Sequence, residues 1–506
     1  MKRIITALAL MLFVIPLKAQ DDESSYKDYN KSRYEDFKKK KLAEMKQYTD
    51  SVQQDYIRFR QKANEEYARF MREHWEEFQS IKGDSMPVIP DPPQPYNRDK
   101  NYQKKTIPKL PIKYNKVFSI PSLDPKLLEQ PKRTEIPVDP VTPSVPEYNF
   151  MFYGTSCMVL LDPKLNFRLS DVSENTVADT WTHLSKGLSE VLLEDFLRLR
   201  DELALGDWAY YCLIRSFSEQ CFGKGSNEAV LMETFMMAQS GYKARIARSD
   251  NGLALMLCFD SQVYQMTYLF LDGEKFYIMD NGRGDGRSSS YYVFNRSFMK
   301  SDRPVSLRMP GTPKLAFKSS GEKTFKSKKY PDMTVTLSLN SNLMDFYKDY
   351  PKCLWANYSW AGLSDEVKSK LYPVLRKSIE GKSQIDAANR LINFVQTAFA
   401  YQSDGKQFGC ERFLFADETF FFPYSDCEDR AILFSVLVRD LLGLDVVLLH
   451  YPDHIATAVH FTESLEGTYL TLDGKPYYIC DPAFIGANVG DCMPRYANSN
   501  PEVYKL

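Results

Sequence analysis

Two stretches of this chain repeat the same pattern of apolar runs and turns at an offset of 202 residues. Residues 225–259 align without a gap on residues 427–461, with five of the 35 positions identical. Each reads as an Ala-led apolar helix that stops at a Gly and is followed by two strands. Downstream, Asp272–Asp280 and Asp473–Asp481 each read as a turn and a strand ending in Asp. The repeat predicts a diverged internal duplication; the alternative is two unrelated α+β domains that share a hairpin.

The length of 506 residues allows two or three domains, at roughly 100–200 residues each. We therefore predict an α+β fold with tandem domains at residues 148–318 and 319–506, the second carrying an extra segment at 402–425. A hydrophobic content of 43% excludes wholesale disorder. The balance of 65 Lys and Arg against 66 Asp and Glu makes a dedicated nucleic-acid binder improbable, because no net positive field attracts a polyanion.

The N-terminus has the pattern of a signal peptide, residues 1–19. Lys2 and Arg3 precede an apolar run from Ile4 to Leu17, and Ala19 closes a step of small residues. No later run reaches the ~18 apolar residues that a membrane span needs. We expect an exported protein, periplasmic or extracellular, with no membrane span after removal of the signal; an uncleaved N-terminal anchor is the alternative.

Residues 20–83 predict one long helix, because Gly and Pro are missing from Ser24 to Lys82. Steps of 3, 4 and 4 residues from Tyr34 to Ile81 meet an apolar or aromatic side chain at twelve of fourteen positions. This period of 11 suits a straight or slightly right-handed helix. Its apolar stripe must be covered by a partner helix, by a second copy of the chain, or by the later domains. Self-association through this helix is therefore one expectation.

Residues 84–147 read as a Pro-rich linker. The stretch from Pro87 to Pro146 holds 14 of the 28 prolines of the chain, which favours an extended, semi-rigid spacer. The alternatives are a peptide ligand for a Pro-binding partner, or a segment that packs along a globular domain. The nine cysteines lie downstream of this linker, and their odd number leaves at least one thiol free in an oxidising compartment.

The second repeat contains a cysteine at the start of its apolar helix. Ser425 with Glu428 three residues later predicts a capping box, which places Cys427 in the first helical turn. The N-terminus of a helix favours anions and lowers the pKa of a thiol. The carboxylates of Asp426, Glu428 and Asp429 act in the opposite direction, so they must point elsewhere if this thiol is a nucleophile.

A cysteine nucleophile needs a base within hydrogen-bond reach and a group that orients the base. His454 begins the predicted strand 454–459, just after a turn. Asp481 ends the predicted strand 477–481. Neighbouring antiparallel strands can place these two side chains next to each other. The candidate catalytic residues are therefore Cys427, His454 and Asp481.

These residues resemble the transglutaminase-like, papain-related superfamily of bacterial exported proteins. The resemblance depends on the sequence Asp426-Cys427-Glu-Asp-x-Ala431 at the start of a helix that stops at Gly443, on His454, and on Asp481 followed by Pro. It covers roughly residues 320–506, with a degenerate version at 148–318. It implies two tandem transglutaminase-like (papain-like) domains and acyl transfer through a thioester. Cys427 would attack an amide carbonyl, His454 would act as general base and acid, and Asp481 would orient the imidazole.

The first repeat provides an internal control for these assignments. It has Gly225 in place of Cys427, Gly252 in place of His454, and Asp280 in place of Asp481. The contrast predicts one active domain beside a degenerate one that serves as a scaffold or a docking surface. For the oxyanion, the backbone N–H of Cys427 is one expected donor, and Gln402 or Gln407 is a second candidate.

Other site chemistries are not indicated. His450, His454 and His460 are close in sequence, but they lie on strands and a turn without the spacing of a zinc site. No Gly-rich phosphate loop lies between a strand and a helix, so neither a nucleotide nor another cofactor is expected. An aromatic run, Phe420–Phe422 with Tyr424, could line a substrate groove but is more typical of core.

The sequence thus favours an exported, cysteine-dependent acyltransferase or hydrolase that acts on peptide or glutamine side-chain amides. The outcome would be that of a transglutaminase or of a cysteine peptidase, with a protein or peptide as substrate. The alternative is a non-catalytic binding or assembly protein of the surface or periplasm that retains the fold.

Overall fold

The computed structural model of the chain mixes helices with mainly antiparallel sheets, which is compatible with the predicted α+β class. From Ala63 on, the chain forms one compact unit; of the preceding residues, 55 and 58–62 are described and are helical. We call residues 145–308 the first module and residues 319–506 the second module. The structure describes residues 55, 58–73, 75–87, 111–119, 145–186, 188–280, 288–294, 296–298 and 301–506.

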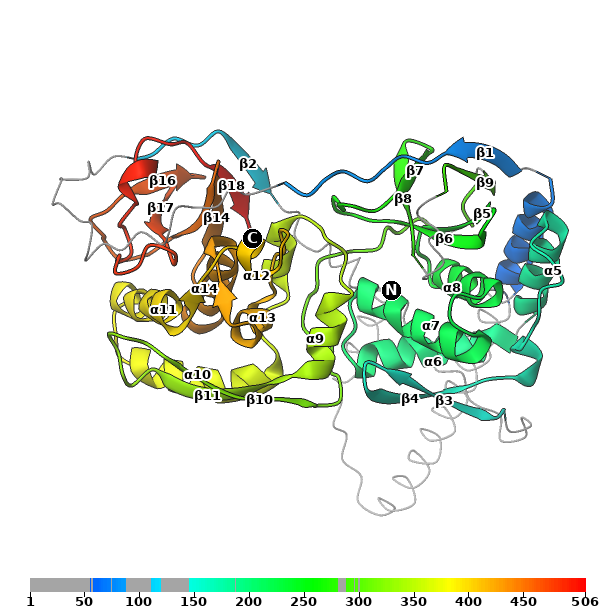
Figure 1. Ribbon diagram of the computed structural model, residues 1–506, viewed down its shortest axis with the longest axis horizontal. Helices are drawn as coiled ribbons and strands as arrows, with labels where there is room; N and C mark the ends of the chain where they lie inside the picture. Colours follow the sequence, from blue (N-terminus) through cyan, green and yellow to red (C-terminus); the bar gives the residue numbers. More distant parts are fainter. Residues whose placement is uncertain are drawn as a thin grey trace, which may run out of the picture. The chain divides into compact units, whose positions relative to one another are not determined.

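Each module contributes five strands to a six-stranded sheet whose sixth strand comes from the chain before residue 145, and the two sheets have the same strand order (Figure 1). The first sheet runs β1-β9-β5-β6-β8-β7, and the second runs β2-β18-β14-β15-β17-β16. The strands of the first sheet are β1 (Trp75–Gln79), β5 (Ala244–Ser249), β6 (Gly252–Cys258), β7 (Tyr268–Leu271), β8 (Glu274–Ile278) and β9 (Ser290–Phe294). Those of the second are β2 (Lys116–Ser119), β14 (Val446–Tyr451), β15 (His454–Val459), β16 (Tyr469–Leu472), β17 (Lys475–Cys480) and β18 (Glu502–Lys505).

Equivalent helices cover one face of each sheet. In the first module, α8 (Asn227–Gln239) precedes β5 and packs on β5 and β6; in the second, α14 (Cys427–Leu442) precedes β14 and packs on β14 and β15. Both helices are apolar nearly all round, because each lies between its sheet and a further layer of helices. That layer contains α5 (Glu174–Leu184), α6 (Leu188–Glu202) and α7 (Asp207–Phe222) in the first module, and α10 (Asp365–Ile379) and α11 (Gln384–Ala398) in the second.

A two-stranded hairpin opens each module. It consists of β3 (Glu147–Phe152) and β4 (Thr155–Leu160) in the first, and of β10 (Ser319–Lys326) and β11 (Thr334–Asn340) in the second. Helices α7 and α8 of the first module, and α11 and α14 of the second, lie between this hairpin and the six-stranded sheet (Figure 1). The second module adds α9 (Ser341–Lys348) and β12 (Ala400–Tyr401) and, in the segment that the first module lacks, α12 (Asp404–Gln407), α13 (Ala416–Phe421) and β13 (Tyr424–Ser425).

The N-terminal helix is shorter at its C-terminal end than the sequence predicts. The helix ends at residue 71, and Trp75–Gln79 form strand β1, which pairs antiparallel with β9. The prediction of a helix up to residue 83 is therefore wrong beyond residue 71. The indole Nε1 of Trp75 donates to the Met71 carbonyl at 2.5 Å, which satisfies a carbonyl that the end of a helix leaves unpaired. Residues 1–54 lie outside the described residues, and with them the predicted signal peptide and most of the predicted helix.

The end of the apolar stripe is covered by the chain itself. The ring of Tyr67 packs on Trp181 at 5.0 Å, on Phe294 at 5.4 Å and on Phe298 at 5.5 Å between centroids. The indole of Trp181 donates to the side-chain oxygen of Asn64 at 2.8 Å. For residues 63–71, the predicted cover by the later domains is therefore the one observed.

Part of the Pro-rich linker adds a strand to the second sheet. Strand β2 pairs parallel with β18, with Val117 opposite Val503, and the N–H of Ile112 donates to the carbonyl of Tyr469. At residues 111–119, therefore, the linker packs along a globular module rather than acting as a free spacer. The rest of the predicted linker, apart from residues 84–87 and 145–147, lies outside the described residues.

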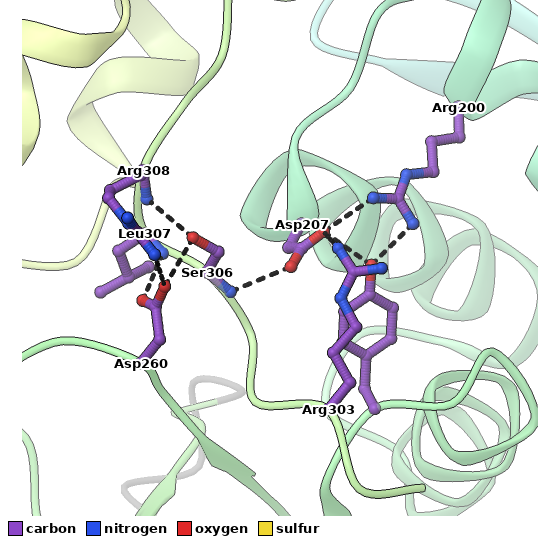
Figure 2. Close-up of polar contacts among 8 residues, drawn as sticks. Arg200, Asp207, Asp260, Arg303, Ser306, Leu307 and Arg308 are labelled. Carbon is purple, nitrogen blue, oxygen red and sulfur yellow. Dashed lines mark hydrogen bonds and ion pairs between the residues drawn. The ribbon is translucent and has the colours of Figure 1, made fainter. Parts of the chain in front are cut away.

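A buried carboxylate in the first module is fully satisfied by its neighbours (Figure 2). Oδ1 of Asp207, the first residue of α7, accepts from Arg200 at 2.7 Å, from Arg303 at 2.8 Å and from the Tyr242 hydroxyl at 2.7 Å. Its Oδ2 accepts from the N–H of Ser306 at 3.0 Å. Two guanidinium groups thus compensate one buried charge, which is the arrangement that keeps such a group stable.

A second carboxylate, Asp260, holds the next residues of the same segment. It accepts from the Ser306 hydroxyl at 2.8 Å, from the Leu307 N–H at 3.1 Å and from the Arg308 guanidinium at 3.1 Å (Figure 2). Leu307 also accepts from the Tyr350 hydroxyl of the second module at 2.8 Å. These contacts fix the end of the first module next to the start of the second.

All nine cysteines are in described parts of the chain, and all are free thiols. The expectation of at least one free thiol therefore holds within this structure. Seven of the nine are buried, and Cys410 alone is exposed. Among the described residues, no helix is both long and apolar enough to cross a membrane.

Candidate active site

Cys427 is the first residue of α14, at the end where the backbone N–H groups are free. The cap of this helix is Asp426, not the predicted Ser425, which lies in the short strand β13. The N–H of Asp426 donates to the Asp429 carboxylate at 3.3 Å, so the capping box is shifted by one residue. The predicted position of Cys427 in the first turn is unaffected by this shift.

The thiol of Cys427 donates to a carboxylate. Its sulfur lies 3.0 Å from Oε2 of Glu428, and the side chain is 1% exposed. Burial, and then the negative charges of Glu428 and Asp426, raise the pKa of the Cys427 thiol well above its ordinary value. The N–H of Ile455 donates to the sulfur, and this bond lowers the pKa of the thiol. In this conformation the carboxylates point toward the thiol rather than away from it, and the thiol form is favoured.

His454 and Asp481 are paired. Nε2 of His454 lies 2.9 Å from Oδ2 of Asp481, and both side chains are buried. Strands β15 and β17 pair antiparallel, with Thr457 opposite Cys480, so Asp481 follows β17 at the end where β15 begins. This is the placement that the sequence predicts for the two side chains.

Asp481 is held rigidly in that position. Its Oδ1 accepts from the N–H groups of Ala483 at 2.9 Å and Phe484 at 3.1 Å. The amide of Gln396 on α11 donates to the carbonyls of Asp481, at 3.2 Å, and of Phe484, at 2.8 Å. The sequence analysis missed Gln396. Its signal is a polar residue on the buried face of a helix, which needs partners there.

Cys427 and His454 are on packed elements but have separate partners. Helix α14 packs on β15, and the residue after His454, Ile455, donates its N–H to the Cys427 sulfur. Within the part of the chain that the structure describes, no hydrogen bond joins the thiol to the imidazole; each is bonded to a carboxylate instead. With Nε2 of His454 on Asp481, its Nδ1 is the atom left for the thiol.

An aromatic side chain covers the imidazole. The ring of Tyr496 stacks on His454, with centroids 5.0 Å apart and planes 6° apart. The Tyr496 hydroxyl donates to Asp453 at 2.9 Å, and Arg495 is ion-paired with the same carboxylate. Together with the burial of Cys427, this contact closes the candidate site to a substrate in this conformation.

The corresponding positions of the first module cannot perform this chemistry. The residue aligned with Cys427 is Gly225, at φ +68°, and the residue aligned with His454 is Gly252, at φ +108°. Both backbones are in a region that disfavours side chains. Asp280, aligned with Asp481, is exposed instead of buried.

Other candidates from the sequence have structural partners. The amide of Gln407 is bonded in both directions to the backbone of Tyr424, at 3.2 and 3.1 Å. Phe420 is fully buried against Phe325 and Phe399, so it belongs to the core. The three neighbouring histidines bind three different groups: His450 contacts Glu502, His454 contacts Asp481, and His460 contacts the carbonyl of Pro476.

Comparisons of the chain with models of protein families, with curated proteins and with solved structures found no match.

Proposed function

We propose that the protein is a cysteine-dependent acyltransferase or hydrolase acting on peptide or glutamine side-chain amides, with Cys427, His454 and Asp481 as its catalytic residues. The observation that carries the proposal is the 2.9 Å contact between Asp481 and His454, which begins β15, the strand on which the helix that starts with Cys427 packs. A carboxylate bound to one imidazole nitrogen fixes the tautomer and presents the other nitrogen to a nucleophile.

The reaction has two steps. His454 takes the proton of the Cys427 thiol, the sulfur attacks the amide carbonyl, and the C–N bond breaks as His454 returns a proton to the leaving amine. The product of this step is a thioester on Cys427. Water or a second amine then attacks the thioester, the C–S bond breaks, and the thiol is regenerated. Water gives hydrolysis, and an amine gives cross-linking.

The site must open before it can act. The thiol has to leave Glu428 for Nδ1 of His454, and Tyr496 has to move from the face of the imidazole. The proposal therefore assigns the present arrangement to the resting state of the enzyme. It also includes export of the protein and a transglutaminase-like fold for both modules.

A second function is favoured by the thiol itself. Its burial, its bond to Glu428 and its raised pKa are those of an inert cysteine. Under that hypothesis the protein is a binding or assembly protein of the surface or periplasm. It would keep the His454–Asp481 pair as a structural contact.

Thiol labelling combined with an activity assay decides between the two functions. With mild iodoacetamide treatment near neutral pH in the presence of glutamine-bearing peptide, we expect Cys427 to react ahead of buried cysteines such as Cys480. Incorporation of a primary-amine probe and peptide cleavage are measured in parallel, with Cys480→Ala as the matched control for Cys427→Ala. If neither activity is detected, or if Cys427→Ala leaves the activity unchanged, the catalytic assignment is wrong.

A further inference from the structure

Five carboxylates converge next to the start of α14, apart from the His454–Asp481 pair. One oxygen from each of Asp404, Asp426 and Asp429 lies within 4.8 Å of the other two, and the same holds for Asp404, Glu411 and Glu428. Asp404 belongs to both groups, so the five side chains form one cluster. We call it the acidic cluster. Four of its members are 4% exposed or less.

Three oxygens of the acidic cluster have no partner in the described part of the chain. They are Oδ1 of Asp404, Oδ1 of Asp426 and Oε1 of Glu428, and all three are buried. Asp207 in the first module shows how the same fold treats a buried carboxylate that is purely structural: both of its oxygens are bonded, and two arginines compensate it. A buried oxygen without a partner costs ~1–3 kcal/mol, and more when charged. Three such oxygens within one cluster require a positive ligand or protons.

The arginine side chains of this region form their hydrogen bonds with groups outside the acidic cluster. Arg430 donates to the Ser425 hydroxyl and to the carbonyls of Gln396 and Phe399. Arg412 forms its ion pair with Glu418, which is outside the acidic cluster. Backbone N–H groups, which carry no full charge, bond three members of the cluster: Arg412 donates to Asp404 at 2.7 Å, Leu414 and Asp426 donate to Asp429 at 3.1 and 3.3 Å, and Asp404 donates to Asp426 at 3.3 Å.

The acidic cluster is a property of the second module alone. The positions aligned with Asp426, Glu428 and Asp429 are Lys224, Ser226 and Asn227 in the first module. Asp404 and Glu411 come from segment 402–425, which the first module lacks. The added segment and the three carboxylates of α14 therefore occur together, as expected if they serve one site.

We infer that Asp404, Glu411, Asp426, Glu428 and Asp429 form a binding site for one calcium ion. Calcium takes six to eight oxygen ligands at ~2.3–2.6 Å, so two ligands of one ion lie at most ~5 Å apart, and the oxygens within each group of three meet this condition. Magnesium is bound at shorter distances and keeps several waters, so it suits an all-protein cage poorly. Zinc prefers nitrogen and sulfur ligands. The bound ion would join segment 402–425 to the start of α14, and this inference is independent of the proposed catalytic function.

Calcium binding by the full chain tests the site directly. After dialysis against EGTA, we expect isothermal titration calorimetry to show one calcium ion per chain, and 1 mM CaCl2 to raise the melting temperature by several degrees. We expect Asp404→Asn to weaken binding by at least roughly tenfold, because it removes the ligand shared by both groups. Asp417→Asn is the matched control, because Asp417 is a buried carboxylate of the same region that is bonded to Ser364. It should leave calcium binding unchanged.

Three results would overturn the inference. They are no binding by the wild-type protein at 1 mM calcium, an equal effect of 1 mM MgCl2, and unchanged binding by Asp404→Asn. If Asp404→Asn does not fold, Glu411→Gln replaces it, since that side chain is half-buried and its loss is better tolerated. Because none of these measurements uses enzymatic activity, failure of the calcium site and failure of the proposed function are distinguishable.

Discussion

At the scale of single residues, the candidate site contains a His–Asp pair suited to catalysis and a thiol whose hydrogen bond disfavours catalysis. His454 has the carboxylate partner that a general base needs, and Asp481 is fixed by two backbone N–H groups. Cys427 instead donates to Glu428. The proposed activity would therefore require a new hydrogen-bond partner for the thiol and a movement of Tyr496, whereas the His–Asp pair is already formed.

Replacement of Asp481 tests that pair. An Asn at position 481 can still accept from Ala483 and Phe484, so we expect folding to persist. It no longer holds the imidazole in the required tautomer, so we expect the thiol-dependent activity to fall by roughly 10²–10⁴-fold. The rate is measured with the amine-incorporation or peptide-cleavage assay. Asp280→Asn, at the aligned and exposed position of the first module, should leave the rate unchanged; equal losses in both variants would contradict the assignment.

The sequence predicts part of this site correctly. A His at the start of a strand and an Asp at the end of a neighbouring one are local patterns, and the antiparallel pairing of β15 with β17 brings them together. The contact of the thiol with Glu428 follows no local pattern, because adjacent helical residues do not normally face each other. It depends on side-chain rotamers and on the neighbouring acidic cluster, which includes residues from a distant segment.

At the scale of elements, the interiors of the modules were easier to predict than their edges. The strand His454–Val459 and the helix stop at Gly443 have the predicted bounds. Strands β1 and β2 escaped prediction, because Trp75–Gln79 continues a helical pattern and Lys116–Ser119 lies in a Pro-rich stretch. Both are edge strands whose structure comes from pairing with β9 and β18. Pairing with strands that are distant in sequence determines these elements, and such pairing cannot be predicted from the local sequence pattern.

One contact between elements predicts a pH dependence of stability. Asp417 on α13 accepts from the N–H and the hydroxyl of Ser364, the cap of α10, and burial raises the pKa of its carboxyl to about 7. Between about pH 4 and pH 7 the folded state therefore keeps a proton that the unfolded state has lost. The free energy of unfolding falls as pH rises through this window, by on the order of 4 kcal/mol in total, and is constant above it.

Asp417→Asn should remove this contribution, because the amide does not titrate. We expect urea unfolding at pH 4.5, 5.5, 6.5 and 7.5 to give a shallower decline for the variant than for the wild type. Asp365→Asn is the control, since Asp365 is an exposed carboxylate in the first turn of α10. A variant with Asn at 417 that declines as steeply as the wild type would show that this carboxyl does not control the slope.

At the scale of the whole molecule, one apolar stripe serves two parts of the chain. Its last turns, with Tyr67 and Met71, are buried in the compact unit that begins at Ala63. Phe59 is on the same stripe in the preceding unit, with 40% of its surface exposed. The stripe thus includes buried positions that stabilise the fold and a position, Phe59, whose side chain keeps part of its surface exposed.

Two matched substitutions separate these roles. Tyr67→Ala removes a ring that packs on three aromatic side chains, so we expect it to lower the free energy of unfolding by about 3 kcal/mol. Phe59→Ala should change that free energy by less than ~0.5 kcal/mol, because the side chain lies outside the core.

If the helix mediates self-association, sedimentation velocity should show a concentration-dependent oligomer that Phe59→Ala weakens while the melting temperature stays constant. If both the wild type and Phe59→Ala are monomers at high concentration, the helix does not mediate self-association. The stripe would then act only within the chain, through the burial of Tyr67 and Met71.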